Sequence, residues 1–254
     1  MNLFEMIEKR KSTRSFTDKT LEDAMLSGIL EFAENAVPLT EFTKTIGPMS
    51  GRIDTGFKLL GANEAKGMFA VKAPHYIALY SKVTEGYLSN AGFIMQQIDL
   101  YLSSLGLGSC WLGQAKPAEK KLYDLEFVIV LAFGEPAESP CRDASEFKRS
   151  PINEISDGAD KRIEYARLAP SAINGQPWFF ICRKDGLHIF WKKLSIVKAF
   201  VLESLRHIDM GIVLCHLWLA SHNFNMPFEI EIDNNCPTPP KGYNYFGTIK
   251  NALQ

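Results

Sequence analysis

The sequence has no excess of charge of either sign and no long apolar run. Lys and Arg number 28 against 29 Asp and Glu, so the net charge is -1, and no overall field would attract nucleic acid or an anionic membrane. No apolar run reaches the length that spans a bilayer, and the first residues lack an apolar segment before a small-residue cleavage site. We therefore expect no binding to nucleic acid or membranes.

Cysteine is scarce and does not follow a pairing pattern. The five cysteines are an odd number without a Cys-x-x-Cys pair, which disfavours both a disulfide framework and a zinc site. The five histidines also lack the spacing of metal ligands. The expectation is a cytoplasmic protein without a metal site.

The residues that are present are sufficient for a folded core. The chain has 254 residues, of which 46% are hydrophobic and 22% charged, and these proportions are ordinary for a globular protein. A chain of this length forms one large domain or two small fused ones.

Apolar periodicity and turn residues predict an α+β fold. Helices are predicted at residues 3–10, 21–32, 87–105 and 160–168, with a further apolar helix that includes residues 209–214. Strands are predicted at residues 76–80, 127–133, 178–182 and 187–191, the last two as a hairpin about Asp185-Gly186. Thr20 and Asp23 have the spacing of a capping box, and Gly106 would cap the end of the helix at 87–105. Residues 38–67 stay unassigned, and the proline-rich segment after Cys236 is expected to be extended.

The second half of the chain repeats the order of the first. Residues 209–214 align without a gap with residues 90–95, which pairs Gly211 with Gly92, and residues 162–166 resemble residues 29–33. We infer two related sheet-and-helix halves, packed as the subunits of a homodimer would be. The alternative is that two α+β halves look alike without being related.

Two polar segments carry candidate chemistry. Residues 10–14 offer three cations and two hydroxyls, a mixture of donors suited to a phosphate. A solvated helix end that interacts with the helix dipole is the alternative.

The second segment is a loop between Pro170 and Pro177. Its side chains Ser171, Asn174 and Gln176 can donate and accept hydrogen bonds from a rigid loop, as recognition of the polar edge of a flat heterocycle requires. The alternative is a turn that satisfies its own backbone.

Together the two segments resemble the FMN-dependent nitroreductase family. That family has an Arg-x-Ser-x-Arg/Lys-x-Phe stretch, found here as Arg10, Ser12, Arg14 and Phe16. It also has a Pro-Ser-x-x-Asn-x-Gln-Pro-Trp stretch, found here as Pro170, Ser171, Asn174, Gln176, Pro177 and Trp178. A Gly-Leu-Gly-x-x-Trp-like loop is matched at residues 106–113, and a Lys/Arg-x-Pro stretch by Lys148, Arg149 and Pro151.

The chain departs from ordinary members in the position of its second motif. The equivalent place in the first half, residues 35–39, has lost its polar residues, and the polar copy lies in the second half. The chain therefore resembles the branch of nitroreductases in which two halves are fused into a pseudo-dimer. The resemblance implies a half at residues 1–145, a half at 146–254, and one FMN site between them. One chain would suffice for this site, and a homodimer is left open.

The resemblance also implies which residues bind FMN. The cofactor-binding residues would be Arg10, Lys11, Ser12, Arg14, Asn63, Lys66, Trp111, Leu112, Gly113, Lys148, Arg149, Pro170, Ser171, Ala172, Asn174 and Gln176. Arg14 would face the pyrimidine edge and stabilise the reduced flavin. The substrate-side lining would come from Phe42 or elsewhere in residues 40–60.

The implied function is NAD(P)H-dependent reduction of small electrophiles such as nitroaromatics or quinones. NADH or NADPH would give a hydride to FMN and leave before the acceptor binds, a ping-pong mechanism. The alternatives are a non-catalytic flavin-binding or ligand-sensing protein of the same fold, and a remnant that binds no cofactor.

Overall fold

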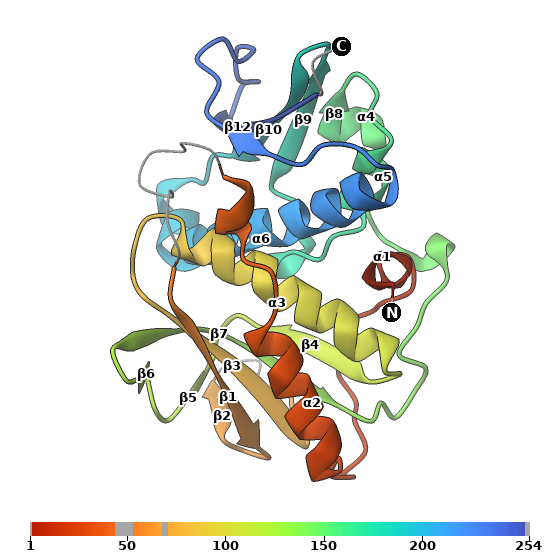
Figure 1. The fold of residues 1–254 in the computed structure, drawn as a ribbon, viewed down its shortest axis with the longest axis vertical. Coiled ribbons are helices and arrows are strands. Elements are labelled where there is room, and N and C mark those ends of the chain that lie inside the picture. Colours follow the sequence, from red (N-terminus) through yellow and green to blue (C-terminus); the bar gives the residue numbers. More distant parts are fainter. Residues whose placement is uncertain (1, 44–52, 68–70, 252–254) are drawn as a thin grey trace. The chain divides into compact units, whose positions relative to one another are not determined.

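The computed structural model describes residues 2–43, 53–67 and 71–251, without the side chains of Ala144 and residues 196–201. The chain forms two compact units. The first comprises the described residues of 1–38, 53–87 and 94–147, and the second those of 39–52, 88–93 and 148–254. One helix, α3, therefore contributes residues to both units (Figure 1).

An antiparallel sheet forms the core of the first unit. Its strands are β1 (Thr55–Gly61), β3 (His75–Ser81), β7 (Leu125–Gly134) and β4 (Gly108–Leu112) in that order, with β6 (Lys121–Leu122) paired to β7. β3 is buried along its whole length, and residues 129–134 of β7 are buried. A separate ribbon pairs β2 (Ala65–Gly67) with β5 (Ala115–Pro117).

Three helices and a short 3₁₀ turn accompany this sheet. They are α1 (Leu3–Met6), α2 (Asp23–Glu34), α3 (Tyr87–Ser104) and η3 (Ala144–Glu146). α2 packs against β1 (Figure 1). The middle of α3 is buried on every side, as apolar residues on more than one face of the helix predict, and its end is followed by Gly106 in the left-handed region at φ 76°.

The second unit has a sheet of its own. Its strand order is β11 (Ile230–Glu231), β12 (Tyr243–Lys250), β10 (Gly186–Lys192), β9 (Trp178–Arg183) and β8 (Ser156–Asp157). All pairs are antiparallel except β8 with β9. The unit also contains α4 (Ile152–Ile155), α5 (Arg162–Arg167), α6 (Ile196–Asn223), η1 (Leu39–Phe42) and η4 (Ala172–Asn174), and α5 packs along α6 (Figure 1).

The two sheets share one order of elements along the chain. β1, β3, α3, β4 and β7 of one are matched by β9, β10, α6, β11 and β12 of the other, and corresponding strands occupy the same places in each sheet. Each central strand pair also carries one register shift, between Leu79 and Tyr80 in β3 and between Ile189 and Phe190 in β10.

The aligned glycines lie where α6 crosses the first part of α3. A methyl group on Gly92 would lie 2.1 Å from the carbonyl oxygen of Ile208, and one on Gly211 would lie 2.0 Å from that of Ser89. Neither position has room for a side chain, so the backbones of the two helices touch directly.

Several expectations about the elements need correction. The helix predicted at 3–10 ends at Met6, and Arg10 instead pairs with Cys141 as an isolated bridge. The capping box of Thr20 and Asp23 is wrong, because α2 begins at Asp23 and Glu22 occupies the cap without a side-chain bond. The helix predicted at 160–168 is shorter, and β1, β2, β11 and β12 were not predicted.

The remaining predicted elements are confirmed. The helix at 87–105 corresponds to α3, the strands at 76–80 and 127–133 to β3 and β7, and the hairpin to β9 and β10. Within the described part of the chain, no helix combines the length and the apolar character needed to cross a membrane.

Candidate cofactor site

Arg10 lies at the centre of the basic turn and is fully buried. Its Nε is 2.9 Å from Oδ2 of Asp99 on α3, which is also fully buried, and its Nη2 donates to Oγ of Ser12 at 3.1 Å. Because a buried cation needs a compensating charge, Asp99 fixes the guanidinium beside the Ser12 hydroxyl.

Asp99 also connects the basic turn to β4. Its carboxylate accepts hydrogen bonds from Ser109 Oγ and, at 3.4 Å, from Trp111 Nε1. The backbone of Thr13 donates to the carbonyl of Ser109 at 2.8 Å. The structure therefore brings the predicted residues of the basic turn next to the predicted Trp111, with Leu112 and Gly113 following on the chain.

Two polar atoms of this cluster have no partner among the described residues. Arg10 Nη1 and Thr13 Oγ1 are buried without a hydrogen bond. Leaving such donors unsatisfied is costly, and a phosphate offers the acceptor oxygens that a guanidinium fork prefers. The basic turn therefore fits a phosphate-bearing cofactor, with Lys11 half-buried and Arg14 exposed beside it.

Arg142 belongs to the same cluster and was not predicted. Its Nε donates to the carbonyl oxygen of Arg10 at 3.0 Å, and its guanidinium lies 3.9 Å from the ring centroid of Phe147. Burial, together with the nearby charge of Arg10, lowers the pKa of Arg142 to about 10. The cluster thus holds three arginines, Arg10, Arg14 and Arg142, against two acids, Asp99 and Glu146, and this excess of positive charge favours an anion.

The predicted residues at 148–149 and 170–176 form a second group, in the second unit. Arg149 donates from Nη1 to Oδ1 of Asn174 at 2.7 Å and from Nη2 to the carbonyl of Leu168 at 3.1 Å. Asn174 Nδ2 donates to the carbonyl of Lys148 at 2.8 Å. The Lys148-Arg149 segment and the proline-bracketed loop are therefore joined, although they are separated in sequence.

The loop bonds both to the segment after Arg149 and to itself. Gln176 Oε1 accepts from the backbone N–H of Ser150 at 2.9 Å, and the backbone N–H of Gln176 donates to Ser171 Oγ at 2.9 Å. The second bond is internal to the loop, as in a turn that satisfies its own polar groups. Amide and hydroxyl groups each have more than one donor or acceptor position, so Ser171, Asn174 and Gln176 keep capacity for a ligand.

The backbone of this loop is strained. Ile173, Asn174 and Gln176 lie at φ 50°, 54° and 42°, and a β-branched residue is a rare occupant of the left-handed region. Ile173 is also 81% exposed. Such strain persists only where surrounding contacts impose it, and it concentrates at binding sites. Asp209 of α6 supplies one of these contacts, because it accepts the backbone N–H of Ala172 at 2.9 Å.

Asn63 and Lys66 lie apart from the basic turn, around a different hollow of the first unit. The hollow has a volume of about 480 Å³ and is lined by residues of β1, the β1–β2 turn, β5 and residues 118–120, among them four lysines and two glutamates. Asn63 forms the tight β1–β2 turn at φ 66°. The contacts that join Arg10, Ser12 and Trp111 do not include these two residues.

Phe42 belongs to an aromatic cluster of the second unit. Its ring centroid lies 5.3 Å from that of Phe228, 5.7 Å from Trp218 and 6.1 Å from Phe93, which is the spacing of packed aromatic pairs. Residues 44–52 of the segment expected to line the substrate side lie outside the described residues.

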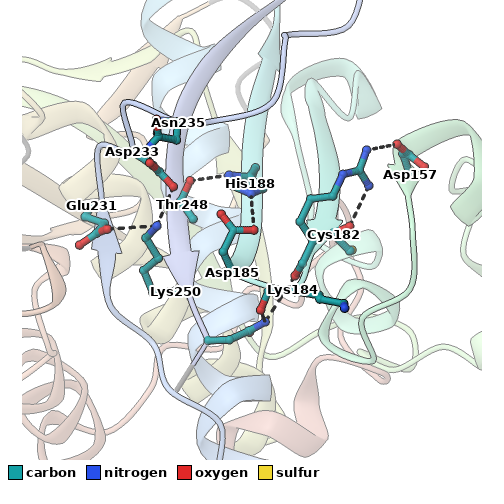
Figure 2. A network of polar contacts seen from close by, with 12 residues as sticks. Asp157, Cys182, Lys184, Asp185, His188, Glu231, Asp233, Asn235, Thr248 and Lys250 are labelled. Atoms are coloured by element: carbon teal, nitrogen blue, oxygen red, sulfur yellow. Dashed lines mark hydrogen bonds and ion pairs between the residues drawn. The ribbon is translucent and has the colours of Figure 1, made fainter. Parts of the chain in front are cut away.

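One group of residues in the second unit has the composition of a metal site. Possible ligand atoms of Asp185, His188 and Asp233 lie within 4.8 Å of one another, but Figure 2 shows them engaged with other groups. His188 contacts Thr248 at 2.8 Å and Asp185 at 3.4 Å, and Lys250 donates to Asp233 at 2.6 Å. The ammonium group already neutralises Asp233 and lowers its pKa, so we assign no metal here.

Comparison with solved structures finds proteins described as nitroreductases or members of that family. A crystal structure of a "putative nitroreductase" from Thermotoga maritima is 26% identical, with a TM-score of 0.59, and the alignment covers 99% of this chain and 94% of that one. A nitroreductase family protein from Streptococcus pneumoniae is 18% identical, with a TM-score of 0.46 and coverage of 61% and 98%. A "putative nitroreductase in complex with FMN" from Desulfovibrio desulfuricans is 21% identical, with a TM-score of 0.43 and coverage of 61% and 94%.

No curated protein sequence matches the chain significantly. The family model described as "Putative TM nitroreductase" matches residues 2–221, which is most of the chain. The fold of this chain, which combines helices with mostly antiparallel sheets, agrees with that match. The chain therefore belongs to the TM nitroreductase family.

Proposed function

We propose that this protein binds one FMN per chain and uses it to transfer a hydride from NADH or NADPH to a small electrophile such as a nitroaromatic or a quinone. The observation that carries the proposal is the buried, unpartnered Nη1 of Arg10 beside the hydroxyl of Ser12. Membership of a nitroreductase family over residues 2–221 supports the reaction class.

The two groups of site residues would hold different parts of the cofactor. Arg10, Lys11 and Ser12 would bind the phosphate, with Arg142 and the Lys148-Arg149 segment adding positive charge. Ser171, Ala172, Asn174 and Gln176 would hydrogen-bond the polar groups of the flavin, and Trp111, Leu112 and Gly113 would contact the ring through their backbone. Pro170 keeps the loop from continuing the preceding helix. Asn63 and Lys66 are the weakest members of the proposed set, because they line a separate hollow.

The flavin, when bound, supplies the ability to accept and release two electrons. The protein contributes to this chemistry by binding the flavin and by stabilising its charge. Arg14 is exposed next to the buried cluster, and its positive charge would stabilise the negative charge that reduction adds. No side-chain acid or base is needed if the proton comes from solvent.

We also propose that the two halves, 1–145 and 146–254, are related and form a pseudo-dimer. The shared order of strands and the reciprocal crossing at Gly92 and Gly211 support this relation. We place the protein in the reducing cytoplasm, because its five cysteines are an odd number without a pairing pattern.

Two spectroscopic measurements test the function. Purified protein, incubated with FMN and desalted, is expected to retain the visible absorbance of the flavin, and FMN should raise the melting temperature. Anaerobic addition of NADH or NADPH is then expected to bleach that absorbance, and a nitroaromatic or quinone to restore it. Binding without bleaching would indicate the flavin-binding or ligand-sensing alternative, and absence of binding would refute the proposal.

A further inference from the structure

Asp209 is a buried acid that contacts the proposed flavin loop directly. It lies on α6 and is only 5% exposed, and its Oδ1 accepts the backbone N–H of Ala172 at 2.9 Å. Ala172 directly follows Ser171 and begins the short η4 turn. The bond therefore fixes the loop at the point where its strained residues begin.

The first half of the repeat contains the same contact. Asn90 of α3 aligns with Asp209, and its Oδ1 accepts the backbone N–H of Leu39 at 2.8 Å. Leu39 directly follows Pro38, and Ala172 lies two residues after Pro170. Each polar side chain lies two residues before the glycine of the helix crossing, so the crossing places both in equivalent positions.

The two contacts differ in what they hold in place. Leu39 belongs to the copy of the loop that has lost its polar residues, whereas Ala172 belongs to the copy that carries Ser171, Asn174 and Gln176. The same backbone bond therefore fixes an apolar segment in one half and the candidate binding loop in the other. Of the two buried side chains, only Asp209 anchors residues with a proposed role in binding FMN.

We propose that Asp209 is a positioning residue for the cofactor: through the N–H of Ala172 it holds the Ser171–Gln176 loop in the conformation that binds FMN. This inference rests on the proposed function, because it concerns the same site. Asp209 itself touches no part of the cofactor in this role. Asn90 shows that an uncharged amide oxygen can accept the equivalent bond, so the role needs an acceptor and not a charge.

Three variants, compared with the wild type, separate positioning from packing. FMN affinity would be measured by fluorescence titration for the wild type and for Asp209→Ala, Asp209→Asn and Asn90→Ala. Loss of one hydrogen bond that orders a binding loop is expected to weaken FMN binding about tenfold in Asp209→Ala. Asp209→Asn should restore the wild-type value, and Asn90→Ala, which removes the matching bond of the other half, should leave it unchanged.

Ala172→Pro provides an independent test, because proline removes the donor and leaves Asp209 in place. The preceding residue is extended at ψ 159° and Ala172 opens a helical turn, which are conditions that proline tolerates. If one bond accounts for both effects, the double variant with Asp209→Ala should bind FMN no more weakly than either single variant. Additive losses between folded variants would contradict the proposal.

Hydrogen exchange in the cofactor-free protein separates failure of this inference from failure of the proposed function. Amides of residues 172–176 are expected to exchange faster in Asp209→Ala than in the wild type or Asp209→Asn. Unchanged exchange, or equal FMN affinity in the wild type and Asp209→Ala, would overturn the positioning role. If the wild type binds no FMN but the exchange differs as expected, the proposed function fails and the contact between Asp209 and the loop remains.

Discussion

Arg10 has two roles that substitution by alanine would confound. Its Nε compensates the buried Asp99, whereas its Nη1 is the unpartnered donor of the proposed phosphate site. Arg10→Ala would strand a buried carboxylate, at a cost of about 3–5 kcal/mol, so a loss of FMN binding could reflect unfolding alone. Arg10→Lys keeps a cation for Asp99 but removes the guanidinium fork.

Arg10→Lys is therefore expected to weaken FMN binding while the protein stays folded. The loss of one charge-assisted hydrogen bond predicts a decrease in binding free energy of about 1.5–3 kcal/mol. Fluorescence titration would measure it, with far-ultraviolet circular dichroism as the check on folding. Arg183→Lys is the matched control, because Arg183 forms an ion pair with Asp157 at the surface of the second unit. Equal affinities for the two variants would remove Arg10 from the phosphate site.

Asp209 makes stability depend on pH. Burial raises its pKa to about 8, with the bond from Ala172 opposing the shift. Among the described residues, no charged group adds to or opposes the effect of burial on this pKa. The folded protein therefore keeps a proton on Asp209 that the unfolded chain releases above its ordinary pKa of 3.8.

Because the folded state binds this proton more tightly, the contribution of Asp209 to stability falls as the pH rises from about 4 to 8. It is lost fully above the folded pKa. Asp209→Asn cannot titrate, so urea unfolding at a series of pH values should show a flatter decline for the variant. The expected difference is on the order of a few kcal/mol across that window. Parallel curves for the two proteins would show that Asp209 is ionised in the folded state at neutral pH.

At the residue level, the groups proposed to bind the ligand are easier to predict from the sequence than the residues that hold them in place. The basic turn and the proline-bracketed loop stand out by composition, but Arg142 reaches Arg10 only because the chain returns beside residues 9 and 10. The sequence does indicate that Asp99 has a structural role. It is the only charged residue of the apolar helix α3, and a lone buried charge requires a partner.

Among the elements, those with strong periodicity are predictable, whereas two strands with an interior glycine are not. β1 contains Gly56, whose missing side chain leaves room for Leu122 and Leu125, and glycine weakens the pattern of a strand. β12 contains Gly247 next to the bulge opposite Ile189 and Phe190, which interrupts the alternation of its side chains. Neither strand can be recognised without the residues that pack on it.

The crossing of α3 and α6 predicts a large difference between two glycine substitutions. Gly211→Ala would place a methyl group 2.0 Å from a carbonyl oxygen of α3, so the helices must separate, at a cost of about 2–4 kcal/mol. Gly28→Ala in α2 meets no atom within 4 Å and should stabilise the protein by up to about 1 kcal/mol. Chemical denaturation of both variants would measure the difference. A neutral Gly211→Ala would mean that the crossing has room to adjust.

For the whole molecule, the sequence predicts the repeat but not the assembly of the site. The alignment of Gly92 with Gly211 is visible in the sequence, and the matching strand order agrees with it. The contacts that join Arg149 to Asn174, or Arg10 to Asp99, link residues far apart in the chain. Such contacts depend on the complete fold, and no local pattern encodes them.

The same repeat predicts how many flavins one chain binds. The loop after Pro170 carries Ser171, Asn174 and Gln176, whereas Pro38 is followed by Leu39-Thr40-Glu41, so a second site would lack this set of donors for the flavin. We expect one FMN per chain, measured as the ratio of flavin absorbance to protein concentration in the monomer fraction of a sedimentation run. The paired substitution Ser171→Ala with Asn174→Ala should remove nearly all bound flavin, whereas Thr40→Ala in the other half should remove none. A ratio of two, with only half lost on the paired substitution, would show that both halves bind FMN independently.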